Sequence, residues 1–262
     1  MADKAILFDS SRCTGCRLCQ MTCRTQRGAA CVIKDGAVVR GAAGPFAQPG
    51  EGDALLTMAF DERWDETAGF RAAWMRKSCM HCRDAACVRV CPTGAMAVRK
   101  ETGLVLNSAD RCVACGLCQT VCPFDVPRPQ TGETRMVKCD GCADRVAAGE
   151  SPWCVGACPA DALRFDDRDK VLDEAMQRVE LLQEQGWERA CLFGATEQGG
   201  LRVIEVLKLG PDETRGEVLA DTGSNSTVKA VELAGPASLG ILGLLTITGV
   251  VTLGYGMKRP RR

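Results

Sequence analysis

The sequence predicts a mixed α+β fold of short strands and helices around cysteine-rich loops, with one transmembrane helix at the C-terminus. The first observation is the cysteine content: the 262 residues include 18 cysteines, which at about 7% is well above ordinary usage. The second is that short strand-like runs such as residues 4–9 alternate with the cysteine-rich stretches. The third is that residues 233–257 form an apolar run of 25 positions without a charged side chain.

The overall composition excludes several classes of function. Lysine and arginine together number 33, as do aspartate and glutamate, so the formal net charge is zero. Nucleic acid is not predicted as a partner, because neutralising phosphates needs a basic excess. The only histidine is His81, which excludes multi-histidine zinc or copper sites and a bis-histidine haem within this chain. A protein of this length buries a sizeable core, so the cysteines are not needed to stabilise a mini-protein.

Sixteen of the cysteines fall into four groups of four, which we number in chain order. The first and third groups share the spacing C-x2-C-x2-C-x3-C, the second has C-x2-C-x4-C-x3-C, and the fourth has C-x2-C-x11-C-x3-C. Proline follows the last cysteine in the second, third and fourth groups, whereas Arg24 stands there in the first. The groups are Cys13, Cys16, Cys19 and Cys23; Cys79, Cys82, Cys87 and Cys91; Cys112, Cys115, Cys118 and Cys122; and Cys139, Cys142, Cys154 and Cys158.

Three kinds of site use cysteines in such numbers. Disulfides are disfavoured because cysteines three positions apart lie on one tight turn and do not readily bridge. Structural zinc also uses the C-x2-C step, but zinc sites usually pair two distant steps of this kind. The run C-x2-C-x2-C-x3-C-P is instead the bacterial ferredoxin signature for 4Fe–4S clusters. A short loop of this spacing wraps three corners of the cube, and its backbone N–H groups point at the sulfides.

The fourth cysteine of each group is predicted to ligate the neighbouring cluster, as in two-cluster ferredoxins. This exchange pairs the groups. Only residues 92–111 separate the second group from the third, so these two are expected to form one module and the first and fourth groups the other. We therefore expect four 4Fe–4S clusters, at sites that we number I to IV. The predicted ligands are Cys13, Cys16, Cys19 and Cys158 at site I; Cys139, Cys142, Cys154 and Cys23 at site II; Cys79, Cys82, Cys87 and Cys122 at site III; and Cys112, Cys115, Cys118 and Cys91 at site IV.

A few residues near the groups are not assigned as ligands. Cys31 and Cys191 are interpreted as small buried hydrophobic residues. His81 lies inside the C-x2-C step of the second group and is interpreted as a loop residue near a cluster. Lys138 directly precedes Cys139, and it either raises a nearby cluster potential or is solvated.

Between the groups, the sequence predicts the short strands of a two-cluster ferredoxin. Residues 4–9 lead into the first group, and strands are expected at 95–98 and 104–106. Residues 35–75 are an insertion rich in Gly and Pro, with a strand expected at 54–60 and no chemistry that we can identify.

After the fourth group the sequence predicts a helix and a hairpin. The helix covers residues 169–185 and can end at Gly186, and strands at 190–193 and 201–209 are joined by a turn around Gly199 and Gly200. The apolar face of the helix is expected to pack on a core or a subunit. That face consists of Val171, Leu172, Ala175, Met176, Val179 and Leu182.

The predicted fold class is therefore α+β: two ferredoxin-like two-cluster modules plus one C-terminal transmembrane helix. The predicted domains are residues 1–34 and 124–168 (first module), 35–75 (insertion), 76–123 (second module), 169–232 (helix and hairpin extension), 233–257 (transmembrane helix) and 258–262 (basic tail).

The C-terminal segment predicts a membrane topology. At about 1.5 Å per residue, residues 233–257 are long enough to cross a hydrocarbon core of about 30 Å. Lysine and arginine fill four of the five positions in 258–262, so the positive-inside rule places the C-terminus in the cytoplasm and the cysteine-rich body in the periplasm. The N-terminal residues do not resemble a signal peptide. We therefore expect export as a folded complex with a signal-bearing partner, after the metal has been bound.

The pattern as a whole resembles the electron-transfer subunits of molybdopterin oxidoreductases, and most closely the iron–sulfur (beta) subunits of the membrane-bound formate dehydrogenase-N type. The resemblance covers nearly the whole chain and is weakest over residues 35–75. The segments that carry it are CTGCRLCQMTC, CMHCRDAACVRVCPTGA, RCVACGLCQTVCPFDVPR, VKCDGCADRVAAGESPWCVGACPADALRF and EAMQRVELLQEQGW.

The resemblance implies a hetero-oligomer in the inner membrane. A catalytic subunit with a molybdenum or tungsten bis-pterin would oxidise formate, this chain would relay single electrons through four 4Fe–4S clusters, and a membrane cytochrome b subunit would reduce quinone. It also implies that the module of the first and fourth groups lies nearer the catalytic subunit. The chain shows no nucleotide-binding loop and no substrate site that we can identify, so no catalytic residue is predicted.

Two alternatives stay open. The same relay occurs in membrane-anchored hydrogenases and in reductases of polysulfide, thiosulfate or dimethyl sulfoxide. A zinc-rich membrane scaffold without a redox role would use the same cysteine count.

Overall fold

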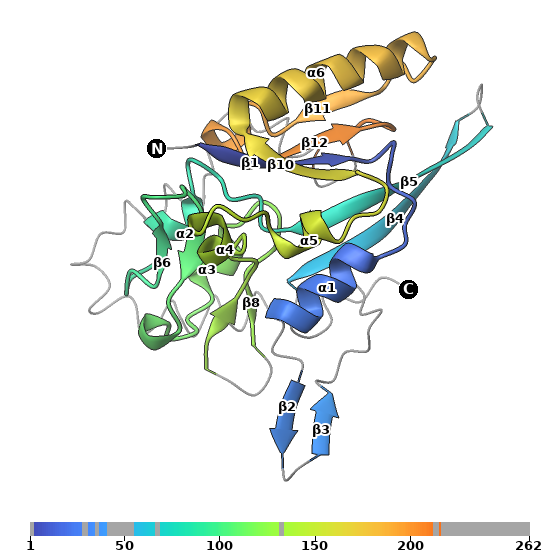
Figure 1. Ribbon diagram of the computed structural model, residues 1–262. Coiled ribbons are helices and arrows are strands. Elements are labelled where there is room, and N and C mark those ends of the chain that lie inside the picture. The colour runs from blue at the N-terminus through green and yellow to red at the C-terminus, as the bar shows by residue number, and fades with distance from the viewer. Residues whose placement is uncertain are drawn as a thin grey trace. The chain divides into compact units, whose positions relative to one another are not determined.

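The computed structural model is shown in Figure 1. It describes residues 3–27, 31–34, 37–40, 55–65, 69–130, 134–211 and 215. The chain divides into two units, residues 1–223 and residues 224–262, and every described residue belongs to the first. The elements are β1 (Lys4–Asp9), α1 (Leu18–Arg27), β2 (Cys31–Lys34), β3 (Ala37–Arg40), β4 (Leu56–Asp65), β5 (Gly69–Ser78), α2 (Ala86–Arg89), β6 (Met96–Val98), β7 (Val105–Asn107), η1 (Ala109–Arg111), α3 (Leu117–Thr120), β8 (Arg128–Pro129), β9 (Met136–Val137), α4 (Ala143–Ala147), α5 (Trp153–Gly156), β10 (Leu163–Asp167), α6 (Arg168–Glu184), β11 (Cys191–Phe193), η2 (Glu197–Gly199) and β12 (Val203–Leu207).

The largest sheet contains four strands in the order β10-β1-β12-β11. Strand β1 pairs antiparallel with β10, placing Ile6 opposite Phe165, and parallel with β12, placing Leu7 opposite Ile204. Strands β11 and β12 form an antiparallel pair at one edge. The hairpin that follows the long helix therefore completes the same sheet from which the chain enters the first cysteine group.

The two faces of this sheet are buried against different elements, because side chains alternate along each strand. Leu7 and Ile204 belong to the apolar cluster that includes Ala175 of α6. Phe8 belongs to a second cluster that includes Cys19 and other cysteines. Figure 1 shows α6 on one side of the sheet, and α1 and α5 on the other. The sheet thus separates the long helix from the cysteine loops.

The predicted helix after the fourth group is confirmed as α6, and Gly186 follows its end with a φ of +86°. Val171, Ala175 and Leu182 are buried, as predicted. Met176 is 47% exposed and does not pack on the core, so for this residue only packing on a subunit stays a prediction. Its position directly after Ala175 turns it about 100° around the helix, off the buried stripe.

Two arrangements of strands and helices repeat in the chain. Strands β1 and β10, which adjoin the first and fourth cysteine groups, pair with each other, and helices α1 and α5 of the same groups are in contact. Strands β6 and β7 lie between the second and third groups and also pair, while helices α2 and α3 of those groups are in contact. The mixed α+β, ferredoxin-like prediction is confirmed for the described residues.

The insertion contains a long hairpin. Strands β4 and β5 pair from Leu56 opposite Ser78 to Asp65 opposite Gly69. The strand predicted at residues 54–60 is confirmed from Leu56 onward, and β4 continues beyond it to Asp65, while residue 54 lies outside the described residues. Strand β5 runs directly into Cys79 and packs Trp74 against the cysteine-containing core cluster.

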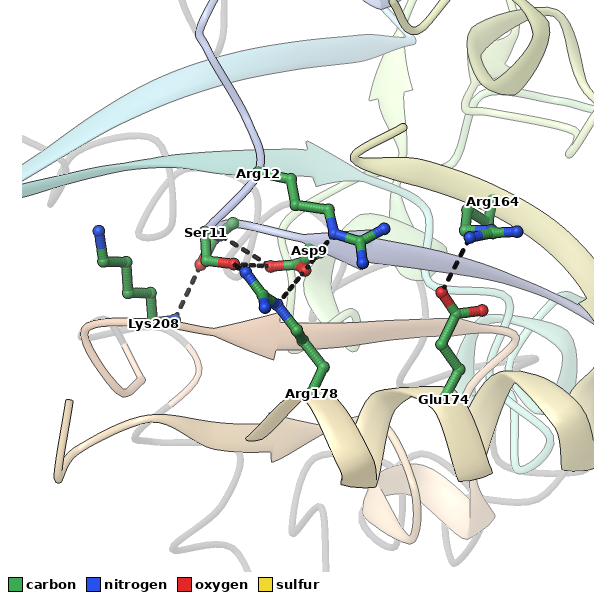
Figure 2. Close-up of polar contacts among 8 residues, drawn as sticks. Asp9, Ser11, Arg12, Arg164, Glu174, Arg178 and Lys208 are labelled. Carbon is green, nitrogen blue, oxygen red and sulfur yellow. Dashed lines mark hydrogen bonds and ion pairs between the residues drawn. The ribbon is translucent and has the colours of Figure 1, made fainter. Parts of the chain in front are cut away.

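The entry to the first cysteine group is held by polar contacts at the end of β1. Asp9 accepts a hydrogen bond from the Ser11 backbone N at 2.8 Å, and its second oxygen lies 3.0 Å from Nε of Arg178 in α6. The hydroxyl of Ser10 accepts the backbone N–H of Lys208 at 2.8 Å. Figure 2 shows Asp9, Ser11 and Arg178 meeting where β1 ends beside α6. Contacts from α6 and from the end of β12 therefore hold the chain in place where the first cysteine loop starts.

The predicted transmembrane helix at residues 233–257 and the basic tail at 258–262 lie outside the described residues. Within the part of the chain that the structure describes, no helix has the length and apolar character needed to span a membrane.

Candidate functional site: four groups of cysteine thiols

The four cysteine groups begin with the same backbone turn. The third residue of each C-x2-C step has a positive φ: +70° at Gly15, +49° at His81, +52° at Ala114 and +68° at Gly141. Only two of these residues are glycines, so sequence alone marks the turn in the first and fourth groups and not in the other two. The common turn shows that spacing, rather than residue type, selects the conformation of these loops.

Backbone N–H groups in and beside the loops point at cysteine sulfur atoms. Such contacts stabilise negative charge on the sulfur. The N···Sγ distances are 3.5 Å from His81 to Cys79, 3.3 Å from Gly141 to Cys139, 3.4 Å from Met96 to Cys91 and 3.3 Å from Met136 to Cys112.

The structure brings together the residues predicted for sites I and II. One cavity is lined by Cys13, Cys16, Cys19 and Cys158, the complete set predicted for site I. A second cavity is lined by Cys23, Cys139, Cys142 and Cys154, the complete set predicted for site II. In each set one cysteine comes from a group more than a hundred residues away in the chain. Helices α1 and α5, which are in contact, position three of these thiols: Cys19, Cys23 and Cys154.

Electrostatic contacts join the thiols of the sets predicted for sites III and IV. Cys82 interacts with Cys79, Cys122 and Cys87, which together are the set predicted for site III. The thiol of Cys118 interacts with the other members predicted for site IV and with Cys87. Those members are Cys115, Cys112 and Cys91. The last cysteine of each group therefore lies beside the partner group, as the exchange of ligands requires.

Burial raises the pKa of eight of the sixteen thiols. It is the largest cause at Cys19, Cys118 and Cys122, each raised to about 12, and at Cys87, raised to about 11. Burial acts in the same direction at Cys91, but hydrogen bonds from Met96 and other neighbours outweigh it and lower its pKa. A buried thiol with a raised pKa is protonated at neutral pH, so binding of iron at these positions has to release protons.

The residues fit a four-iron cube better than a small ion. All the cysteines whose side chains the structure describes are free thiols. Nowhere in the described ranges do three or more Cys, His, Asp or Glu side chains lie close enough together to hold a single metal ion. Four thiols spread around a cavity, with backbone N–H groups directed at sulfur, match a cluster that takes one thiolate at each iron corner.

Lys138 is buried rather than solvated, so one of the two alternatives for it was wrong. It is 7% exposed. Its ammonium donates to the carbonyl oxygen of Cys139 at 2.9 Å and to that of Val105 in β7. The lysine also interacts electrostatically with Cys87 of site III. It therefore carries a positive charge into the region between the second and fourth groups.

His81 is also buried, at 1% exposed. Its Nδ1 accepts the backbone N–H of Val105 at 3.1 Å, which places the ring proton on Nε2. Burial is the main cause that keeps the pKa of His81 well below its usual value, and the charges of Lys138 and Arg76 act in the same direction. A Cβ atom built on Gly141 would lie 3.2 Å from Nε2. The imidazole therefore fills the space between the loop of the second group and the loop of the fourth.

Arg76 was missed by the sequence analysis. It lies in β5, is 1% exposed and lines the cavity of site II. No local motif marks it, since its only distinction in the sequence is that it precedes Cys79 by three residues.

Of the two unassigned cysteines, Cys191 is half-buried beside the core cluster, while the side chain of Cys31 lies outside the described residues.

Comparison with known families gives two matches. Residues 70–168 match the family described as "4Fe-4S dicluster domain", and residues 10–26 match the "4Fe-4S binding domain" family. The first range contains the second, third and fourth cysteine groups, and the second range contains the first group.

The chain is similar along most of its length to iron–sulfur subunits of oxidoreductases. It is 34% identical over 213 residues to the formate dehydrogenase iron-sulfur subunit of Haemophilus influenzae, covering 78% of this chain and 64% of that subunit. It is 34% identical over 210 residues to the nitrate-inducible formate dehydrogenase iron-sulfur subunit of Escherichia coli, covering 79% and 68%. For the B subunit of the anaerobic dimethyl sulfoxide reductase of H. influenzae, identity is 34% over 171 residues, covering 65% and 77%. The chain thus spans about two thirds of the length of the formate dehydrogenase subunits that it matches.

Proposed function

This chain thus belongs to the iron–sulfur subunits of the formate dehydrogenase and dimethyl sulfoxide reductase family, and on that premise we propose that it relays single electrons through four 4Fe–4S clusters held at sites I to IV. The observation that carries the proposal is the grouping of the thiols. Cys23 lines one cavity with three cysteines of the fourth group, and Cys158 lines another with three cysteines of the first. This exchange of the last ligand is the property that distinguishes a two-cluster module from separate metal sites.

The proposed path runs in the order I, II, III, IV. Cys19 of site I interacts with Cys154 of site II, and Cys118 of site IV interacts with Cys87 of site III. The step between the two modules falls between sites II and III, where His81 and Lys138 lie between the second and fourth groups. Clusters held by the cysteines of these sites would supply one-electron redox chemistry, and no bond to a cysteine would need to break.

We assign the electron donor as a catalytic subunit with a molybdenum or tungsten bis-pterin that oxidises formate, and the acceptor as a membrane cytochrome b that reduces quinone. The extent of the alignments supports formate. The match to the formate dehydrogenase subunits covers 78–79% of the chain, against 65% for the dimethyl sulfoxide reductase subunit.

A second candidate keeps the relay and changes the catalyst to a dimethyl sulfoxide reductase, as the match to the B subunit of that enzyme allows. Isolation of the intact complex from its membrane separates the two. A co-purified molybdopterin subunit that oxidises formate supports the first candidate, one that reduces dimethyl sulfoxide supports the second, and a nickel–iron subunit contradicts both.

The ligand assignment is tested by removing single cysteines from the full chain and measuring iron and EPR signals. The intact chain is expected to hold about sixteen iron atoms in four 4Fe–4S clusters. Cys23→Ala should remove the cluster of site II and leave that of site I, although Cys23 belongs to the first group in the sequence. Cys158→Ala should remove the cluster of site I and leave that of site II. Cys191→Ala is the matched control and should keep all the iron. Loss of the site I cluster from Cys23→Ala would contradict the exchange of ligands.

We propose that residues 233–257 span the inner membrane. Residues 258–262 then lie in the cytoplasm and the cysteine-rich body lies in the periplasm. The folded chain would be exported together with a signal-bearing partner. The absence of charge over 233–257 and the basic residues that follow support this topology. Reporter enzymes fused to the C-terminus test it: a reporter that is active only in the cytoplasm should work there. Activity of a periplasm-specific reporter at the same position would contradict the proposal.

A further inference from the structure

Arg76 is a buried cation without a protein counter-charge of its own. It is 1% exposed, and neither its Nε nor its Nη1 has a hydrogen-bond partner among the described residues. An arginine is always charged in proteins, and a buried charge is strongly unfavourable unless it is paired and hydrogen-bonded. The structure therefore leaves a positive charge and two N–H donors in need of an acceptor.

The nearest carboxylate is already engaged. Glu205 in β12 is fully buried and pairs with Arg215, whose Nη2 lies 2.9 Å from the second oxygen of Glu205. The same arginine also donates to the backbone oxygen of Arg76 at 2.8 Å. Two guanidinium groups thus lie beside one carboxylate, and one positive charge is left over.

Thiols of the cluster sites also lie close to Arg76, and Asp140 lines the same cavity. Arg76 lines the cavity of site II together with all four cysteines of that site. It interacts electrostatically with Cys154 and Cys139 of site II and with Cys19 of site I, and it hydrogen-bonds Cys154. A cluster with four thiolates is an anion, so it would balance the positive charge of Arg76.

We infer that Arg76 is the charge partner of the cluster at site II, donating N–H hydrogen bonds to its sulfur atoms and holding its potential up. This inference rests on the cluster sites proposed above and adds a residue that is not a ligand. A hydrogen-bonded cation stabilises the reduced cluster more than the oxidised one, because reduction adds a negative charge. Arg76 is a positioning and tuning residue in this role, because it exchanges neither electrons nor protons.

The position of Arg76 also predicts which clusters respond to its charge. Since it interacts with Cys19 as well as with Cys154, site I should respond in the same direction but less than site II. The thiols that act most strongly on Arg76 belong to sites I and II, so the clusters of sites III and IV should respond less.

The experiment uses the full chain, purified without oxygen with its clusters bound. Three variants separate charge from packing: Arg76→Met removes the charge, Arg76→Lys keeps it without the planar fork of donors, and Arg168→Met is the matched control. Arg168 is also buried, at 7% exposed, but it donates to the carbonyl oxygens of Leu201 and Ala195 instead of approaching a cysteine group. The readouts are iron content and EPR-monitored redox titration, with the site II signal identified as the one that Cys142→Ser alters.

For Arg76→Met we expect the equilibrium constant for reduction of the site II cluster to fall about tenfold, a shift of about 59 mV to lower potential for one electron. Arg76→Lys should restore most of this shift, and Arg168→Met should leave the potential unchanged. An unchanged site II potential in Arg76→Met, or an equal fall in Arg168→Met, overturns the inference.

A measurement on the unsubstituted chain covers the case in which Arg76→Met does not load its clusters. Arginine labelled with ¹⁵N only in the guanidinium should give a ¹⁵N coupling on the site II EPR signal, because Arg76 is the one arginine among the described residues that lines that cavity. No such coupling on a well-formed site II signal overturns the inference and leaves the proposed relay standing. A chain without any iron–sulfur cluster overturns both.

Discussion

The first and third cysteine groups have the same spacing but different surroundings. Both follow C-x2-C-x2-C-x3-C, and both adopt positive φ at the same two positions: Gly15 and Arg17 in the first group, Ala114 and Gly116 in the third. The chains then diverge. Helix α1 continues from Leu18 to Arg27, whereas α3 ends at Thr120.

The two loops also pack in different apolar clusters. Cys19 of the first group lies in the large core cluster with Phe8 of the main sheet. Cys118 of the third group lies in a small cluster with Met96 and Met136. The comparison teaches that the spacing of the cysteines determines the turn of a loop, while elements from elsewhere in the chain determine its burial and its charge environment.

The largest expected difference between the two groups concerns the residue after the last cysteine. Arg24 lies inside α1, where proline would remove a helical hydrogen bond and disfavour helical backbone at the preceding residue. Arg24→Pro should therefore lower the free energy of unfolding by about 3 kcal/mol. The third group already has Pro123 at this position, so Pro123→Ala should change the free energy of unfolding by less than about 1 kcal/mol.

Denaturant titration of the cluster-loaded chain, followed by circular dichroism and by cluster absorbance, measures both effects. Equal losses from the two substitutions would show that the long helix of the first group contributes little to its stability.

The next difference concerns the glycines of the two loops. A Cβ built on Gly15 would lie 2.0 Å from Trp74, which is itself held by Phe60 at 5.0 Å between ring centroids and by Arg17 at 5.1 Å. A Cβ on Gly116 would meet nothing within 4 Å.

Alanine at either position forces a side chain into left-handed backbone, which costs about 1–2 kcal/mol. Gly15→Ala should add overpacking against Trp74, worth about 1–3 kcal/mol more. The melting temperatures of the two variants measure the difference, and the double variant Gly15→Ala with Trp74→Ala is the control. If the glycine effect does not shrink when Trp74 is removed, the contact is not its cause.

The smallest expected difference is in the exposure of the second cysteine of each loop. Cys16 and Cys115 are both exposed, whereas all four thiols of site II are buried. In the isolated full chain, oxygen or an iron chelator should therefore destroy the clusters of sites I and IV at similar rates, and both faster than that of site II. Decay of the separate EPR signals with time measures these rates. Loss of site II first would show that exposure of the thiols does not control access to the clusters.

Much of the fold and of the candidate site could be predicted from the sequence, because spacing and period are local properties. The strands at 4–9 and 96–98, the helix α6 and the four cysteine groups all follow from such patterns. The positive φ at His81 and Ala114 could not be predicted, because neither residue type favours it strongly; the shared loop geometry imposes it. Arg76 and Lys138 could not be placed either, because an isolated basic residue is usually solvated.

By itself, the sequence determined which sixteen cysteines form groups, which groups pair and which family the chain resembles, because these follow from the identity and spacing of neighbouring residues. Only the tertiary structure decided what surrounds them. The β4–β5 hairpin carries Trp74 and Arg76 to the first and fourth groups, and the β11–β12 hairpin completes the sheet that covers them. Those contacts join residues far apart in the chain. Burial and unbalanced charge at the clusters therefore depend on the folded arrangement, which no local pattern encodes.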